Sequence, residues 1–190
     1  IHEIRGLMQV RARRDGAKAF AITSPSRGSG KTSLTVGLAS SLAISGTRTL
    51  LVDCDLAGRV AAVGGSRRAG DGGGKSQPPA EVKQNLDQVM LQMGYLDEHD
   101  PEVFLLAHDA TIGITGLLDG APLAACVIDT SVPNLSILPA LSATQQHIGR
   151  MSSAFIRRLI DEAGATHDLI IFDTGPIPGS VEGLFVTSEA

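Results

Sequence analysis

The chain has 190 residues, which at about 150 residues per domain predicts a single globular domain. Its apolar fraction of 43% and charged fraction of 19% are ordinary for a folded protein, which excludes a disordered chain and a collagen-like or coiled-coil rod. Lys and Arg total 16 against 20 Asp and Glu, and aromatic residues make up only 3%. This composition argues against a dedicated nucleic-acid-binding protein.

The cysteine content and the hydropathy of the sequence bear on where the protein works. Cys54 and Cys126 are the only cysteines, too few for a disulfide framework or a zinc site, and they predict a reducing cytoplasmic setting. No apolar run approaches the roughly 18 residues that cross a bilayer. The first residue is Ile1 and not Met. We therefore also consider a piece of a longer protein whose membrane parts are absent from this sequence.

The first 60 residues predict one strand–loop–helix–strand unit. Arginines mixed with apolar residues before residue 15 predict a basic amphipathic helix, either at an interface or simply solvated. Residues 19–23 predict a buried strand, and the Ser/Gly-rich stretch that follows predicts a loop. Leucines at four-residue spacing predict a helix that begins near Lys31 and ends at Gly46. Residues 49–52, apolar after Thr49, predict a second strand.

The rest of the chain continues the alternation of strands and helices. Residues 64–80 are rich in Gly, Ser and Arg and predict a flexible insertion, followed by a helix over 82–93. Residues 135–138 and 169–172 predict strands, and residues 155–163 predict a helix between them. The alternation predicts an α/β fold, a three-layer sandwich in which helices flank a mostly parallel sheet. Ligands of such folds bind beyond the carboxyl ends of the strands.

The most specific motif lies between the first predicted strand and the helix that follows it. Small residues leave backbone N–H groups free to surround an anion, Lys31 can reach the β- and γ-phosphates, and Thr32 can offer its hydroxyl to Mg²⁺. Pro25 stands where the usual eight-residue pattern has its first glycine. A Gly/Ser turn that only caps a helix is the weaker alternative. The candidate phosphate-binding residues are Arg27, Gly28, Ser29, Gly30, Lys31, Thr32 and Ser33.

Carboxylates follow two of the predicted strands. Asp53 and Asp55 end the second strand, and Asp173 ends the strand over 169–172. Such residues can hold a Mg²⁺ ion or accept a proton from an attacking hydroxyl. One Asp after a strand is commonly just a turn former, but the combination with the phosphate loop favours a joint site. We predict Lys31, Asp53, Asp55 and Asp173 as catalytic residues, and Thr32, Asp53 and Asp173 as metal ligands.

The segment SPSRGSGKTSLTVGLASSLAISGTRTLLVDCDLAGR, together with residues 113–120, 132–140 and 167–183, resembles the cytoplasmic P-loop kinase domain of bacterial tyrosine kinases of exopolysaccharide and capsule biosynthesis. This family lies within the wider deviant-Walker P-loop ATPase superfamily. The resemblance implies that Lys31 and Thr32 belong to Walker A, Asp53 and Asp55 to motif A′, and Asp173 to Walker B. It also implies ATP and Mg²⁺ as cofactors and tyrosine as acceptor. The cytoplasmic domain of, or a peripheral partner to, an inner-membrane protein is the location that the resemblance implies.

The differences from the family keep other functions open. Ser26 stands where the related partition and division-site ATPases carry a second lysine, which favours the kinases over an ATPase switch. Tyr95 is the only tyrosine, although the family's autokinases have a tyrosine-rich tail, so we expect a C-terminally truncated domain or transfer to another protein. A non-catalytic nucleotide-binding regulator of a membrane polysaccharide-export partner is a further alternative. A homo-oligomer is compatible with the resemblance.

Overall fold

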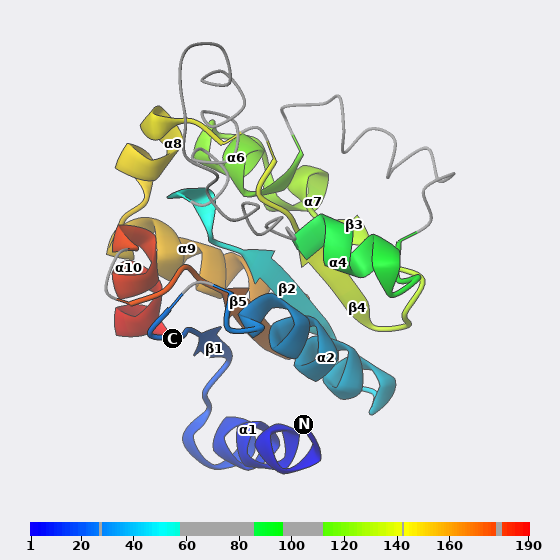
Figure 1. Ribbon diagram of the computed structural model, residues 1–190. Helices are drawn as coiled ribbons and strands as arrows, with labels where there is room; N and C mark the ends of the chain where they lie inside the picture. The colour runs from blue at the N-terminus through cyan, green and yellow to red at the C-terminus, as the bar shows by residue number, and fades with distance from the viewer. Residues whose placement is uncertain (27, 58–85, 97–111, 142, 178–179) are drawn as a thin grey trace, which may run out of the picture.

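The structure is a computed structural model, and it describes all residues except 27, 58–85, 97–111, 142 and 178–179. Within these residues the chain forms one five-stranded sheet in the order β1-β5-β2-β4-β3 (Figure 1). Neighbouring strands are parallel except for β3 and β4, which pair antiparallel. The strands are β1 (Ala19–Ile22), β2 (Thr49–Asp53), β3 (Ile128–Asp129), β4 (Leu135–Leu138) and β5 (Leu169–Asp173).

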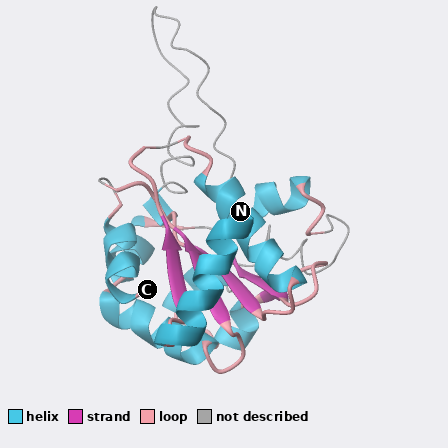
Figure 2. Ribbon diagram, turned by 90° about the horizontal axis from the view of Figure 1, so that it is seen from below, coloured by secondary structure: helices cyan, strands magenta, loops and turns pink. Residues whose placement is uncertain are grey.

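Helices cover both faces of the sheet, so that the strands lie between two helical layers (Figure 2). Helices α2 and α4 pack on one face, with α1 against α2, and α6, α7, α9 and α10 contribute to the core on the other face. The helices are α1 (His2–Asp15), α2 (Lys31–Ile44), α4 (Leu86–Gln92), α6 (Gly113–Leu118), α7 (Leu123–Cys126), α8 (Gln145–Arg150), α9 (Ser153–Ala163) and α10 (Val181–Glu189).

The continuous apolar sequence of β2 and β5 follows from this sandwich. Successive side chains of a strand point to opposite faces, so both faces of a covered strand must be apolar. Leu51 and Ile171 pack in the core on the α2 side, whereas Leu50 and Ile170 pack in the core on the α9 side. All four side chains are fully buried. The two strands that carry the predicted acidic residues are therefore buried on both faces.

Glycine residues set both ends of α2, the helix that follows the predicted phosphate loop. Gly30 precedes the helix with a φ of 76°, and Gly46 lies just beyond its end with a φ of 88°. Both values are in the left-handed region, which residues with a side chain rarely adopt. The predicted helix from Lys31 to the turn at Gly46 is confirmed.

The predicted fold class is confirmed, and most predicted elements are found. The helix before residue 15, the strands over 19–23, 49–52, 135–138 and 169–172 and the helix over 155–163 match α1, β1, β2, β4, β5 and α9 within three residues at each end. The predicted insertion over 64–80 lies outside the described residues, and α4 is the described part of the helix predicted over 82–93. Among the described residues, no helix is both long and apolar enough to span a membrane.

Candidate functional site

The loop between β1 and α2 has the backbone conformation that anion-binding turns require. Gly28 and Gly30 adopt φ values of 73° and 76°, on either side of Ser29, which has no positive φ. Alternating conformations of this kind make successive N–H groups converge, and the amino end of α2 adds its positive dipole end. Serine hydroxyls brace the loop, because Ser24 and Ser29 both donate to the carbonyl of Ser26, at 2.6 and 3.2 Å.

The residues of this loop are accessible to solvent. Gly28, Ser29 and Gly30 are exposed, and Lys31 and Thr32 are half-buried at the first turn of α2. Ser33 is exposed, and Arg27 lies outside the described residues. A phosphate chain could therefore approach the loop from solvent while Lys31 and Thr32 face it from the helix. Which of these residues bind phosphate stays a prediction.

The parallel register of the sheet places the acidic residues side by side. Asp53 and Asp173 are paired at the carboxyl ends of β2 and β5, and the backbone N–H of Cys54 donates to the carbonyl of Asp173 at 2.8 Å. Ile22, the last residue of β1, pairs with Asp173 on its other side. Because the phosphate loop begins directly after β1, the loop and both aspartates lie together at the carboxyl ends of the strands. Each aspartate is only 3% exposed.

Asp173 is the centre of a cluster that also contains Lys31, Thr32, Asp53 and Asp55. Its carboxylate accepts a hydrogen bond from the side chain of Thr32 and lies close enough to Lys31, Asp53 and Asp55 to be influenced by their charges. Burial, followed by the negative charge of Asp53, raises the pKa of Asp173 to about 7, and the Thr32 hydroxyl and Lys31 offset only part of this effect. The structure thus brings together five residues that the sequence analysis selected from three separate segments.

Asp55 projects from the turn that follows β2. The backbone N–H of Asp55 donates to Asp53 Oδ1 at 3.1 Å, which fixes the turn between the two carboxylates. A Cβ atom built on Gly175 would lie 3.2 Å from Asp55 Oδ1 and 2.8 Å from Ser180 Oγ. The Asp55 side chain therefore lies against the segment that follows Asp173. Any side chain at position 175 would force Asp55 or Ser180 to move.

The segments after β1 and β5 are tied to each other. Thr174 Oγ1 donates to the carbonyl of Ile22 at 3.0 Å, and Thr23 Oγ1 donates to the carbonyl of Gly175 at 3.2 Å. The backbone N–H of Ile177 donates to the carbonyl of Ser24 at 2.9 Å. These bonds hold the start of the phosphate loop in register with the aspartate strand. The sequence analysis did not find these threonines, because only the sheet order makes them neighbours.

The donor atoms of the cluster fit a hard divalent cation. A threonine hydroxyl and two aspartate carboxylates are oxygen ligands, the type that Mg²⁺ prefers over the nitrogen and sulfur ligands typical of zinc. In the described part of the chain, no group of three or more His, Cys, Asp or Glu residues could hold a metal ion. Mg²⁺ commonly binds to one or two carboxylates and to the phosphates of a nucleotide, so this small donor set fits Mg²⁺ together with a nucleotide.

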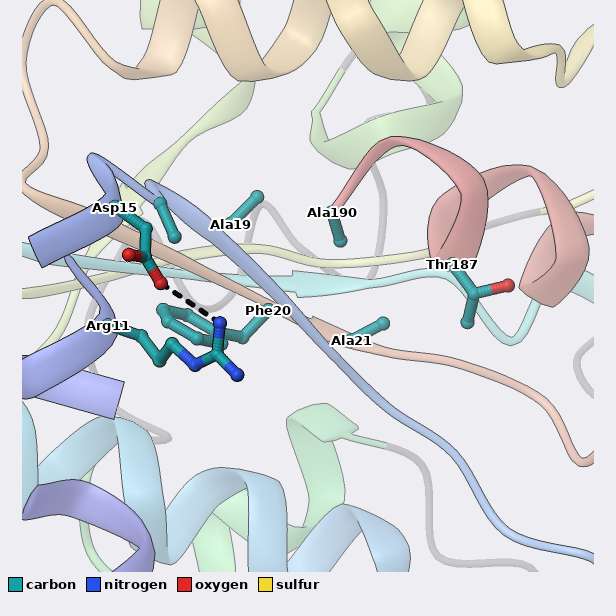
Figure 3. Close-up of a pocket in the computed structure, with 8 residues that line it drawn as sticks. Arg11, Asp15, Ala19, Phe20, Ala21, Thr187 and Ala190 are labelled. Carbon is teal, nitrogen blue, oxygen red and sulfur yellow. Dashed lines mark hydrogen bonds and ion pairs between the residues drawn. The ribbon is translucent and has the colours of Figure 1, made fainter. Parts of the chain in front are cut away.

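A separate hollow lies at the β1 edge of the sheet, between α1, β1 and α10 (Figure 3). Its volume is about 400 Å³, and Phe20 and Thr187 are among its lining residues. Arg11 Nη1 donates to Asp15 Oδ2 at 2.9 Å on its α1 side. None of the predicted phosphate-binding, metal or catalytic residues lines this hollow. It is therefore distinct from the cluster around Asp173.

One buried hydroxyl of the cluster escaped the sequence analysis. Thr35 is fully buried, and its Oγ1 lies 3.4 Å from Asp173 Oδ1. Its position three residues after Thr32 places both threonines on one side of α2, a spacing that is visible in the sequence. That this side of the helix meets Asp173 follows only from the packing of α2 on β5.

Comparisons with known proteins agree with this architecture. The chain is 26% identical over 172 residues to the tyrosine-protein kinase CpsD of Streptococcus agalactiae, covering 90% of this chain and 58% of CpsD. The kinase domain of the Escherichia coli tyrosine kinase ETK superposes with a TM-score of 0.67 at 16% identity, covering 98% of this chain and 57% of that one. The chain thus spans a little over half the length of these relatives.

A division protein shares the fold as well. The septum site-determining protein MinD from Pyrococcus horikoshii, in complex with Mg-ADP, superposes with a TM-score of 0.56 at 20% identity, covering 91% of this chain and 54% of MinD. The resemblance to bacterial tyrosine kinases is confirmed by the match to CpsD, and the fold is shared with ETK and MinD. The sequence profile of the AAA domain family AAA_31 matches residues 17–188. The chain therefore belongs to the AAA_31 family of AAA domains.

Proposed function

We propose that this chain is a Mg·ATP-dependent protein tyrosine kinase domain that acts in exopolysaccharide or capsule biosynthesis. The observation that carries the proposal is the convergence of Lys31, Thr32, Asp53 and Asp55 on buried Asp173, beside a glycine turn suited to phosphate. The similarity to CpsD, a tyrosine-protein kinase, supports phosphoryl transfer to tyrosine as the reaction. The motifs that carry the resemblance to the capsule and exopolysaccharide kinases support the biological role.

In this proposal the phosphate loop holds the triphosphate. The backbone N–H groups around Gly28 and Gly30 bind phosphate oxygens, and Lys31 neutralises the charge that develops on the transferred phosphoryl group. Arg27, Ser29 and Ser33 belong to the same predicted set. The bonds from Thr23 and Thr174 keep the loop aligned with the aspartates while the nucleotide is bound.

The metal ligands are proposed to be Thr32, Asp53 and Asp173. Mg²⁺ supplies charge neutralisation at the β- and γ-phosphates when it is bound. Asp173 has a pKa of about 7, so a nearby cation would favour its ionised form. Thr32, which hydrogen-bonds Asp173 in this structure, would turn its oxygen toward the cation.

Asp55 is proposed to act on the acceptor. It is half-buried, lies at the tip of the turn after β2, and contacts the segment after Asp173. The tyrosine oxygen forms the new bond to the γ-phosphorus while the bond from that phosphorus to the bridging oxygen of ADP breaks. The Asp55 carboxylate accepts the phenolic proton.

The acceptor and partners follow from the same proposal. The sequence holds one tyrosine, Tyr95, which is half-buried after α4 and packs against the core. We therefore propose a protein tyrosine other than Tyr95 as the acceptor, or action together with a membrane polysaccharide-export partner at the cytoplasmic face. A homo-oligomer is compatible with this arrangement.

A labelling experiment separates this proposal from its alternatives. The chain is incubated with Mg²⁺, ATP labelled at the γ-phosphate and a Glu–Tyr copolymer as acceptor, with Asp173→Asn as the inactive control. The proposal expects label on copolymer tyrosine. Release of labelled phosphate without protein labelling would instead identify an ATPase switch, for which the fold shared with MinD provides support. Nucleotide binding with neither product would identify a non-catalytic regulator.

A further inference from the structure

Thr35 is a buried polar residue at the cluster to which the proposed function gives no role. It lies in the second turn of α2, is fully buried, and its Oγ1 donates to the carbonyl of Lys31 at 2.8 Å. The same oxygen lies 3.4 Å from Asp173 Oδ1. The hydroxyl thus has two acceptors within reach, one in the helix backbone and one in the carboxylate.

A second buried hydroxyl on α2, that of Ser40, makes a hydrogen bond to the helix backbone and serves as a comparison for Thr35. Ser40 is 2% exposed and donates to the carbonyl of Val36 at 2.8 Å, the same bond four residues back that Thr35 makes. Among the described residues, no carboxylate accepts a hydrogen bond from Ser40. Back-bonding is a common way for Ser and Thr to satisfy their hydroxyls inside a helix. Thr35 differs from Ser40 in its additional contact with Asp173.

The Asp173 carboxylate is held by two hydroxyls of α2. Thr32 also hydrogen-bonds this carboxylate, and its position three residues before Thr35 puts the two hydroxyls on one side of the helix. In the proposed function Thr32 would offer its oxygen to Mg²⁺ and would then no longer donate to Asp173. Thr35 is fully buried one turn further along α2, whereas Thr32 is half-buried, so the Thr35 hydroxyl stays beside the carboxylate.

We infer that Thr35 is a positioning residue: its hydroxyl holds Asp173 in the orientation needed for Mg²⁺ once Thr32 has turned to the cation. The inference rests on the proposed binding of Mg²⁺ and nucleotide. Rotation of the hydroxyl moves its proton from the Lys31 carbonyl toward Asp173 without a large shift of heavy atoms.

The test compares three variants of the full chain. Thr35→Val removes the hydroxyl at nearly constant volume, Thr35→Ser retains it, and Ser40→Ala removes the matched hydroxyl that has no carboxylate partner. Affinity for a fluorescent ADP analogue is measured once with Mg²⁺ and once with EDTA, and the ratio of the two is the readout. Thermal unfolding verifies that each variant is folded, and Thr35→Ala replaces Thr35→Val if the latter is not.

The expected result concerns only the Mg²⁺-dependent part of the affinity. In Thr35→Val the ratio of the affinity with Mg²⁺ to the affinity with EDTA should fall about tenfold, while the affinity in EDTA stays unchanged. In Thr35→Ser and Ser40→Ala the same ratio should stay within about threefold of that of the original protein. An unchanged Mg²⁺ gain in Thr35→Val, or an equal loss with and without Mg²⁺, would overturn the positioning role. If the original protein bound no nucleotide under either condition, the proposed function itself would be refuted. The positioning role of Thr35, which rests on it, would then be refuted as well.

Discussion

At the scale of single residues, the candidate site depends on one basic side chain, Lys31, and one buried acid, Asp173, which lies close enough to feel its charge. Lys31 starts α2, and Asp173 ends β5 with 3% exposure. The positive charge of Lys31 lowers the pKa of Asp173, although burial and Asp53 outweigh it. Both residues were identified from sequence because strand ends and a Gly-Lys-Thr turn are local patterns. Their proximity is a consequence of the sheet order.

Replacement of Lys31 by Ala should weaken Mg·ATP binding or turnover by at least about tenfold, or about 1.4 kcal/mol, because a phosphate loses its fixed counter-charge. Calorimetric titration with ATP measures this loss. Lys18→Ala is the matched control, because it removes the same charge away from the loop. Lys18 directly precedes β1, and its side chain donates to the carbonyl of Gly164. Unchanged affinity together with unchanged turnover in Lys31→Ala would discard its role.

Replacement of Asp173 by Asn should abolish the proposed activity. In the absence of nucleotide, the same replacement should stabilise the folded protein. The folded-state pKa of about 7 is above the unfolded value of 3.8, so the folded protein binds more protons between these values. Ionisation of Asp173 therefore costs stability progressively as pH rises through this window, and the cost is complete above pH 7. Asp173→Asn avoids that cost.

The expected gain at pH 8 is about 1–3 kcal/mol, which corresponds to roughly 2–4 °C in melting temperature for each kcal/mol. At pH 4 most of the gain should be absent. Thermal melts at the two pH values measure it, with the exposed Asp161→Asn as the control for loss of a surface carboxylate. A gain of the same size at both pH values, or a loss at pH 8, would contradict the assigned environment of Asp173.

At the scale of elements, long apolar strands and helices with a clear apolar stripe were predictable, and short elements were not. Strand β5 is apolar up to its final aspartate, β2 is apolar between Thr49 and Asp53, and α9 shows its stripe in Phe155, Ile156 and Leu159. Helices α6 and α8 have six residues each, too short to show a helical period. Local capping signals such as Thr144 and Ser180 could have located the starts of α8 and α10.

Helix α6 begins at a position that accepts only glycine. Gly113 has a φ of 82°, and a Cβ atom there would lie 2.1 Å from the carbonyl oxygen of Pro139, which also accepts a bond from the N–H of Ile114. Gly113→Ala should therefore destabilise the protein by about 2–5 kcal/mol, through backbone strain and overpacking.

Urea unfolding measures this effect, with Gly149→Ala as the matched control. Gly149 lies inside α8, has no positive φ, and a Cβ atom there would meet nothing within 4 Å. The control should be neutral or should stabilise by up to about 1 kcal/mol, because Ala favours the helix. Equal unfolding midpoints for the two variants would show that the contact between α6 and Pro139 does not constrain the fold.

At the scale of the whole molecule, the candidate site is a product of topology. The order β1-β5-β2 brings the phosphate loop, Asp173 and Asp53 to one edge of the sheet, although Lys31 and Asp173 are far apart in the chain. The alternation of strands and helices predicts a parallel sheet, and hence that strand ends gather at one edge. It does not predict which strands are neighbours. For that reason the aspartates were predictable, whereas the bonds of Thr23, Thr174 and Thr35 were not.

A crystal structure of the full chain with Mg²⁺ and a non-hydrolysable ATP analogue would show whether the loop and the aspartates form one nucleotide site. We expect the β- and γ-phosphates in the turn around Gly28 and Gly30, with Lys31 at the γ-phosphate. We expect Mg²⁺ beside Thr32 and within direct or water-mediated reach of Asp53 and Asp173. A nucleotide bound elsewhere, for example in the hollow at the β1 edge, with Lys31 and Asp173 making no contact to it or its metal, would refute the proposed site.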